Sequence, residues 1–161
     1  MAEPQDMARF VLSYENLKAW CDRQKYEYRA NDDVGQLAIN YALLGQPSPL
    51  MILPHLSRGM VMLAMRQPYS VPADRRAAIL EATSLLNSTS LMGAWTANRE
   101  TGEMFFRVTV VALDIGYTDQ GLLHVARVVV GTSEKAAPAL RAVALDGAEP
   151  SKAISALVMP S

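Results

Sequence analysis

The sequence predicts an α+β fold: an antiparallel sheet of about five strands with helices packed on it, in the order helix, three strands, helix, two strands, helix. Three observations support this prediction. Apolar residues recur at helical spacing in residues 6–21, 73–87 and 118–146. Segments with alternating or continuous apolar side chains lie between these stretches. Clusters of Gly, Pro, Asn and Asp separate the segments.

The first half of the chain is predicted to form a helix and then strands. Residues 6–21 carry an apolar stripe on one side and charged side chains on the other. Residues 26–29 and 37–43 alternate and are joined by turn-forming residues, so they predict a hairpin. Pro54 cannot donate to a strand ladder. We therefore expect the segment that holds it to be an edge strand or an irregular approach to the strand at 60–66.

The second half is predicted to form a helix, a hairpin and a long helix. Pro72 or Ala73 opens the second helix, which ends where residues 87–90 lower the helix propensity. Residues 91–97 and 103–113 predict the last hairpin. Thr118 is the expected N-cap of the third helix, and Pro138 predicts a kink or a restart within it. We expect one domain over residues 1–147 and a C-terminal tail over 148–161.

Composition narrows the class of protein. The chain has 161 residues, a formal charge of −1 and no clustered cations, which disfavours binding to nucleic acid. No apolar run approaches the roughly 20 residues that span a bilayer, and the N-terminus lacks the features of a signal peptide. A single Cys21 fits a reducing compartment. We therefore expect a cytoplasmic protein with no membrane or nucleic-acid partner.

The sequence offers no catalytic, cofactor-binding or metal site. His55 and His124 have no second ligand at metal-site spacing, so surface or boundary positions are expected. Cys21 lies on an apolar stripe, which favours a core position over a reactive thiol. Asp114 and Asp119 are expected to close a strand-to-helix connection; an enzyme would have to gather them with His124 in a cleft.

Several strands predict an interaction surface, because residues 50–53, 60–65 and 108–113 carry apolar side chains on both sides of the strand. Three helices cannot shield both faces, so a second subunit or the tail is expected to cover one. Arg107 lies inside an apolar strand, where a structural ion pair is the first expectation and partner recognition the second. We predict Arg107, Met60, Met62 and Trp95 as possible protein-interaction residues.

Short motifs in most of residues 5–146 resemble the YbjN family of bacterial proteins. The motifs are Val71-Pro72, Leu86-Asn87, the turn Arg99–Glu103 before Phe106-Arg107, Thr118-Asp119 and residues 137–140. The Gly116-Tyr117 connection and the apolar tail depart from the pattern. The resemblance implies a sensory-transduction regulator, a fold like that of type III secretion chaperones, and a dimer.

These observations predict a non-enzymatic, chaperone-like regulatory module that acts as a homodimer and binds an unidentified protein. The alternative is a small-ligand sensor whose pocket is lined by Trp20, Tyr41, Trp95 or Phe106. An enzyme is the third possibility.

Overall fold

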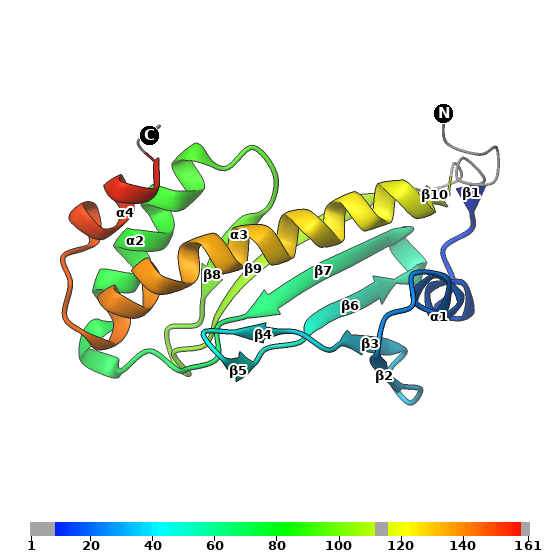
Figure 1. Cartoon of the computed structure of the whole chain (residues 1–161), viewed down its shortest axis with the longest axis horizontal. Coiled ribbons are helices and arrows are strands. Elements are labelled where there is room, and N and C mark those ends of the chain that lie inside the picture. The colour runs from blue at the N-terminus through cyan, green and yellow to red at the C-terminus, as the bar shows by residue number, and fades with distance from the viewer. Residues whose placement is uncertain (1–8, 112–115, 159–161) are drawn as a thin grey trace.

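The computed structural model of the chain describes residues 9–111 and 116–158. Figure 1 shows the long helix α3 passing over the sheet, with α1 at one end of the molecule and α2 and α4 at the other. The helices are α1 (Tyr14–Arg23), α2 (Arg76–Thr89), α3 (Asp119–Leu145) and α4 (Pro150–Val158), with short turns η2 (Leu56–Arg58) and η3 (Ala73–Arg75).

The main sheet has six antiparallel strands, which confirms the predicted α+β class. Their spatial order is β2 (Tyr28–Asn31), β3 (Gln36–Ile39), β6 (Leu50–His55), β7 (Met60–Arg66), β9 (Met104–Val111) and β8 (Ala94–Ala97). Two short pairs lie outside it, formed by β1 (Arg9–Phe10) with β10 (Tyr117–Thr118) and by β4 (Ala42–Leu43) with β5 (Gln46–Pro47).

The core lies between the sheet and the helices. Alternate residues of β7, namely Val61, Leu63 and Met65, have no exposed surface and point to the side that α3 covers. α3 supplies the opposing buried stripe, which includes Leu122, Val129, Leu140 and Val143. Complete burial of such a side chain contributes about 1.5–3 kcal/mol. This layer therefore fixes which parity of each strand faces inward.

The first helix begins later than the sequence predicts. Ser13 has an extended backbone, and its Oγ accepts a hydrogen bond from the Asn16 N–H at 3.1 Å, which makes it the N-cap of α1. Arg9 and Phe10 instead pair with Thr118 and Tyr117 as β1. The predicted start at residue 6 is wrong because this strand pairing takes the preceding residues out of the helix.

Pro54 and Pro138 both lie inside elements that continue past them. β6 is an interior strand between β3 and β7, yet Pro54 lies beyond Ile52, the last residue that β3 pairs. Its missing N–H therefore falls where no β3 partner exists. Pro138 lies inside α3, which continues to Leu145 without the restart that was one of the two expectations.

Short side-chain contacts hold the β8–β9 hairpin against α2. The Asn87 side chain accepts a hydrogen bond from the Trp95 N–H at 2.7 Å and donates one to the Trp95 carbonyl at 3.0 Å. This amide therefore occupies the free edge of β8 as a further strand would. Gly102 has φ +74°, and a Cβ there would collide with the Val71 backbone. The turn before β9 needs glycine for this close approach.

The C-terminal segment packs on the helices. Ile154 of α4 is buried in the same core, and α4 contacts α2 and α3. Arg75 donates hydrogen bonds to the carbonyls of Val143 (2.9 Å) and Ala148 (2.8 Å), which ties the start of α2 to the connection between α3 and α4. The tail consequently lies away from the side of the sheet that α3 leaves uncovered.

Replacing Asn87 with Ala is expected to lower the free energy of unfolding by about 1–3 kcal/mol, because the N–H and carbonyl of buried Trp95 lose their partners. Equilibrium urea denaturation measures the loss. Ser88→Ala is the matched control, since the Ser88 Oγ bonds only within its own helix, to Leu85. Equal stability of the two variants would contradict the edge-capping role.

Candidate functional site

One face of the sheet carries apolar side chains, and no helix of residues 9–111 and 116–158 packs on it. We call this surface, formed by the outward residues of β6, β7, β8 and β9, the open face. A shallow hollow of about 510 Å³ lies on it. Its lining consists of Met51, Leu53, Met62, Ala64, Thr96, Ala97, Asn98, Phe105 and Arg107. The open face is therefore mainly apolar, although it faces solvent.

The strand register explains how these side chains come together. Ala38, Met51, Ala64 and Arg107 lie opposite one another in a row across four strands. The next row places Leu53 beside Met62. Strand side chains alternate between the two faces of a sheet, so these residues point outward while their neighbours along each strand form the fully buried inward rows. Met51, Leu53 and Met62 remain partly exposed.

Arg107 is the cation that lines the hollow of the open face. Small residues flank it, Ala64 on one strand and Ala94 on the other. Its Nη1 lies 4.0 Å from the Met62 Sδ. Within the described part of the chain no carboxylate lies within 4.0 Å of Arg107, so the structural ion pair expected first is wrong. An exposed guanidinium on an apolar surface is suited to receive a carboxylate from outside.

The structure separates the four predicted interaction residues. Met62 and Arg107 meet in the hollow, and Met60 lies on the same face near its border, opposite His55 and Val111. Trp95 faces the other way and is only 3% exposed, with its ring 5.3 Å from that of Phe106. Trp95 therefore does not belong to the open face.

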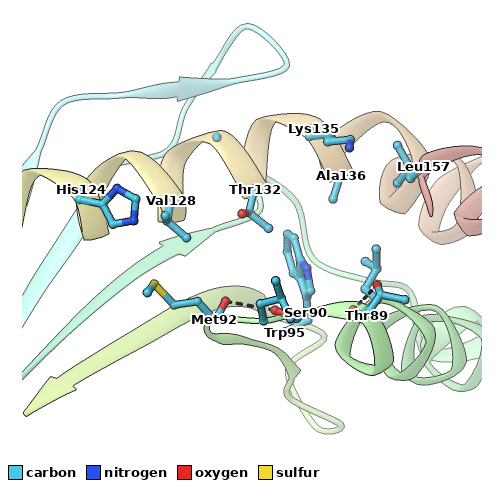
Figure 2. A pocket seen from close by; sticks show the side chains of 13 residues that line it. Thr89, Ser90, Met92, Trp95, His124, Val128, Thr132, Lys135, Ala136 and Leu157 are labelled. Atoms are coloured by element: carbon cyan, nitrogen blue, oxygen red, sulfur yellow. Dashed lines mark hydrogen bonds between the residues drawn. The ribbon is translucent and has the colours of Figure 1, made fainter. Parts of the chain in front are cut away.

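A second hollow lies on the helix side. Figure 2 shows residues of α3 facing the end of α2 and the connection that follows it. We call this hollow, of about 610 Å³, the α3 groove. It is lined by Leu86, Thr89, Ser90, Leu91, Met92, Trp95, His124, Val128, Gly131, Thr132, Lys135, Ala136 and Leu157. Its size lies within the range of small-molecule sites.

The pocket expected for a ligand sensor differs from this groove. Trp20 and Phe106 have no exposed surface, and Tyr41 is half-buried beside Tyr26. Of the four predicted lining residues, Trp95 lines the α3 groove. The aromatic residues chosen from the sequence thus belong mostly to the core.

The candidate catalytic residues have structural or surface positions. Asp119 accepts two hydrogen bonds of 2.7 Å from Arg23, and its carbonyl accepts one from the Trp20 indole at 3.2 Å. Asp119 therefore ties the start of α3 to α1, while Thr118 is the N-cap of α3, and the expected role of Asp119 in closing the preceding connection stays a prediction. Asp114 lies outside the described residues. His124 is exposed at the α3 groove and His55 is exposed at the end of β6.

No group of three or more His, Cys, Asp or Glu side chains that could hold a metal occurs in residues 9–111 and 116–158. The helices of these same ranges include none that is both long and apolar enough to cross a bilayer.

A six-stranded antiparallel sheet with helices on one side, an apolar open face and an apolar groove define the class of this protein as an α+β domain. The chain belongs to the YbjN family: the family model, described as a putative bacterial sensory transduction regulator, matches residues 13–142. The resemblance predicted from the short motifs is confirmed, and the family supports a regulatory role. No curated protein sequence matches the chain.

The fold is similar to the crystal structure of YbjN, a putative transcription regulator from E. coli. The TM-score is 0.62 at 11% sequence identity, and the match covers 79% of this chain and 90% of that chain. Such a low identity establishes a common fold and does not transfer a function.

Sequence reasoning missed most of the α3 groove. Gly131 and Lys135 continue a helical stripe that starts at His124 and Val128. This spacing can be found in the sequence. The glycine is its most unusual feature, because glycine is a poor helix former. The sequence predicts a strand that includes Leu91 and Met92. In the structure both residues lie in the connection before β8, which Gly93 with φ +80° separates from the strand.

Cys21 is expected to resist alkylation in the native protein at pH 8 and to react fully in urea. The thiol has no exposed surface, and burial raises its pKa to about 12, with Asp22 adding to the shift. Little thiolate therefore forms. Mass spectrometry after iodoacetamide treatment measures the reaction. Rapid labelling of folded protein would contradict the core assignment.

Proposed function

We propose that this protein is a non-enzymatic, chaperone-like regulatory module of the cytoplasm that acts as a homodimer, and that a second copy covers the open face. The observation that carries the proposal is the group of apolar side chains on the uncovered side of the central strands. A solvated sheet face normally bears polar residues at these positions. Here they are Met51, Leu53 and Met62, with Phe105 nearby.

A second copy is the best candidate to cover the open face, because α4 packs on the other side of the sheet. Homodimer interfaces are more apolar than ordinary surface, and their centres are depleted in charge. Only Arg107 carries a charge in the hollow. A two-fold contact is self-complementary, so each Arg107 must meet a polar or acidic group of the partner rather than the partner's own Arg107.

Regulation requires a further partner, which we propose to be another protein. Affinity capture from the source cell followed by mass spectrometry identifies it. A variant with an altered open face then tests whether this partner uses the same surface: capture that persists with the Leu53→Lys variant would place the partner elsewhere.

A second candidate function, small-ligand sensing, is favoured by the α3 groove. It has the volume of a ligand site and an apolar floor formed by Trp95 and Ala136, both 3% exposed. The groove and the open face lie on opposite sides of the sheet, so the two functions are compatible.

The wild-type chain is expected to be a dimer at micromolar concentration, and Leu53→Lys is expected to weaken the dimer at least about 30-fold because it buries an unpaired charge. Light scattering with size-exclusion chromatography measures both states.

Leu145→Lys is the matched control, since Leu145 is 43% exposed at the end of α3. Circular dichroism should show both variants folded. A strictly monomeric wild type, or equal dimerisation of the two variants, would overturn the proposed assembly.

A further inference from the structure

We propose that the α3 groove binds a straight-chain carboxylate whose alkyl tail lies along α3 and whose head group meets Lys135. This inference rests on the ligand-sensing candidate above and is independent of the homodimer. Four features of the groove support it: its form, its floor, its rim and its charge.

The groove has the form of a channel rather than a round cavity. Its lining residues on α3 run from His124 to Ala136, twelve residues apart, which corresponds to about 18 Å of helix. The end of α2 and the following connection form the opposite wall, and Leu157 of α4 lines one end, as Figure 2 shows. A long, narrow ligand fits this form better than a compact one.

Gly131 keeps the channel open. A Cβ at this position would meet no atom within 4 Å, so the space beside it is empty. Glycine is a poor helix former, and nothing in the local backbone of α3 requires it here. Val128 and Trp95 complete an apolar floor that an alkyl chain can cover.

The rim carries exposed apolar side chains. Leu91 is fully exposed and Met92 is 42% exposed. The Ser90 hydroxyl lies 3.0 Å from the Met92 carbonyl and 3.2 Å from the Gly93 carbonyl, which holds this connection in place beside the groove. Two neighbouring apolar side chains on such a rim can close over a bound alkyl chain.

The charge of the groove selects an anion. Lys135 and His124 are its ionisable lining residues, and the lining contains no Asp or Glu. No carboxylate of the described chain lies within 4.0 Å of the Lys135 ammonium. A ligand carboxylate can therefore pair with Lys135 without displacing an internal partner.

Titration calorimetry with octanoate, decanoate and dodecanoate, each below its micelle concentration, tests the proposal. Affinity should rise about 15-fold for every two methylenes, because each methylene buried in the groove is worth about fourfold. 1-Decanol, the neutral analogue, should bind more weakly than decanoate.

Variants assign the binding to the groove. Gly131→Leu should abolish decanoate binding while melting at the same or a higher temperature, because leucine fills empty space and favours the helix. Lys135→Gln should weaken decanoate at least fivefold and leave 1-decanol unchanged. Lys152→Gln, on the exposed side of α4, is the matched control and should bind decanoate normally.

Three results would overturn the proposal: no binding of any carboxylate, unchanged binding by Gly131→Leu, or equal effects of Lys135→Gln on decanoate and 1-decanol. Flotation with phosphatidylglycerol vesicles tests a membrane as the source of the ligand, because protein that floats with vesicles but does not bind free decanoate gives the first of these results. Leu53→Lys should retain decanoate binding, so failure of the dimer and failure of this site are distinguishable.

Discussion

The packing of α3 against one side of the sheet is the constraint on which the rest of the structure depends. At 27 residues, α3 is about 40 Å long, which exceeds the width of six strands spaced about 4.8 Å apart. It contacts the central strands β6, β7 and β9, and it also holds the Arg23–Asp119 pair that fixes α1. Once α3 lies on this side, the inward parity of every central strand is determined. The outward-facing residues of these strands do not contact α3, so they can contact a partner.

Two of the short motifs contact each other, and a third holds the neighbouring hairpin, so these residues have structural roles. Asn87, at the end of α2, pairs with the Trp95 backbone at the free edge of β8. The carbonyl of Gly102 accepts a hydrogen bond of 2.8 Å from the Val71 N–H, just before Pro72. These contacts join α2, β8 and β9 into one unit. They fix the position of the connection that forms a wall of the α3 groove, so the motifs relate to the architecture of a site rather than to its chemistry.

The sequence was sufficient to predict most of the fold and little of the site. Helical spacing and turn residues identified the main helices and the two hairpins, and two-faced strands such as β7 indicated that apolar side chains lie on both sides of the sheet. The start of α1 was missed because the pairing of Phe10 with Tyr117 joins residues far apart in the sequence. The prediction that grouped Trp95 with Arg107 in one interaction surface is wrong about Trp95, which is buried on the other side of the sheet. Their faces are set by register: Trp95 pairs with Phe106, the neighbour of Arg107, and adjacent residues point to opposite sides.

The apolar composition of the open face is better explained by binding to a partner than by the requirements of folding. The inward rows already supply a closed core, with Leu50, Ile52 and Leu63 fully buried. Outward residues on the same strands bury less area, so polar β-formers such as Thr would serve the sheet nearly as well. Thr109 occupies such a position beside Met62 and shows that this face accepts one. Met51, Leu53 and Phe105 therefore add apolar surface that folding does not need. Arg107, which has no carboxylate partner among the described residues, gives that surface an orientation for a partner.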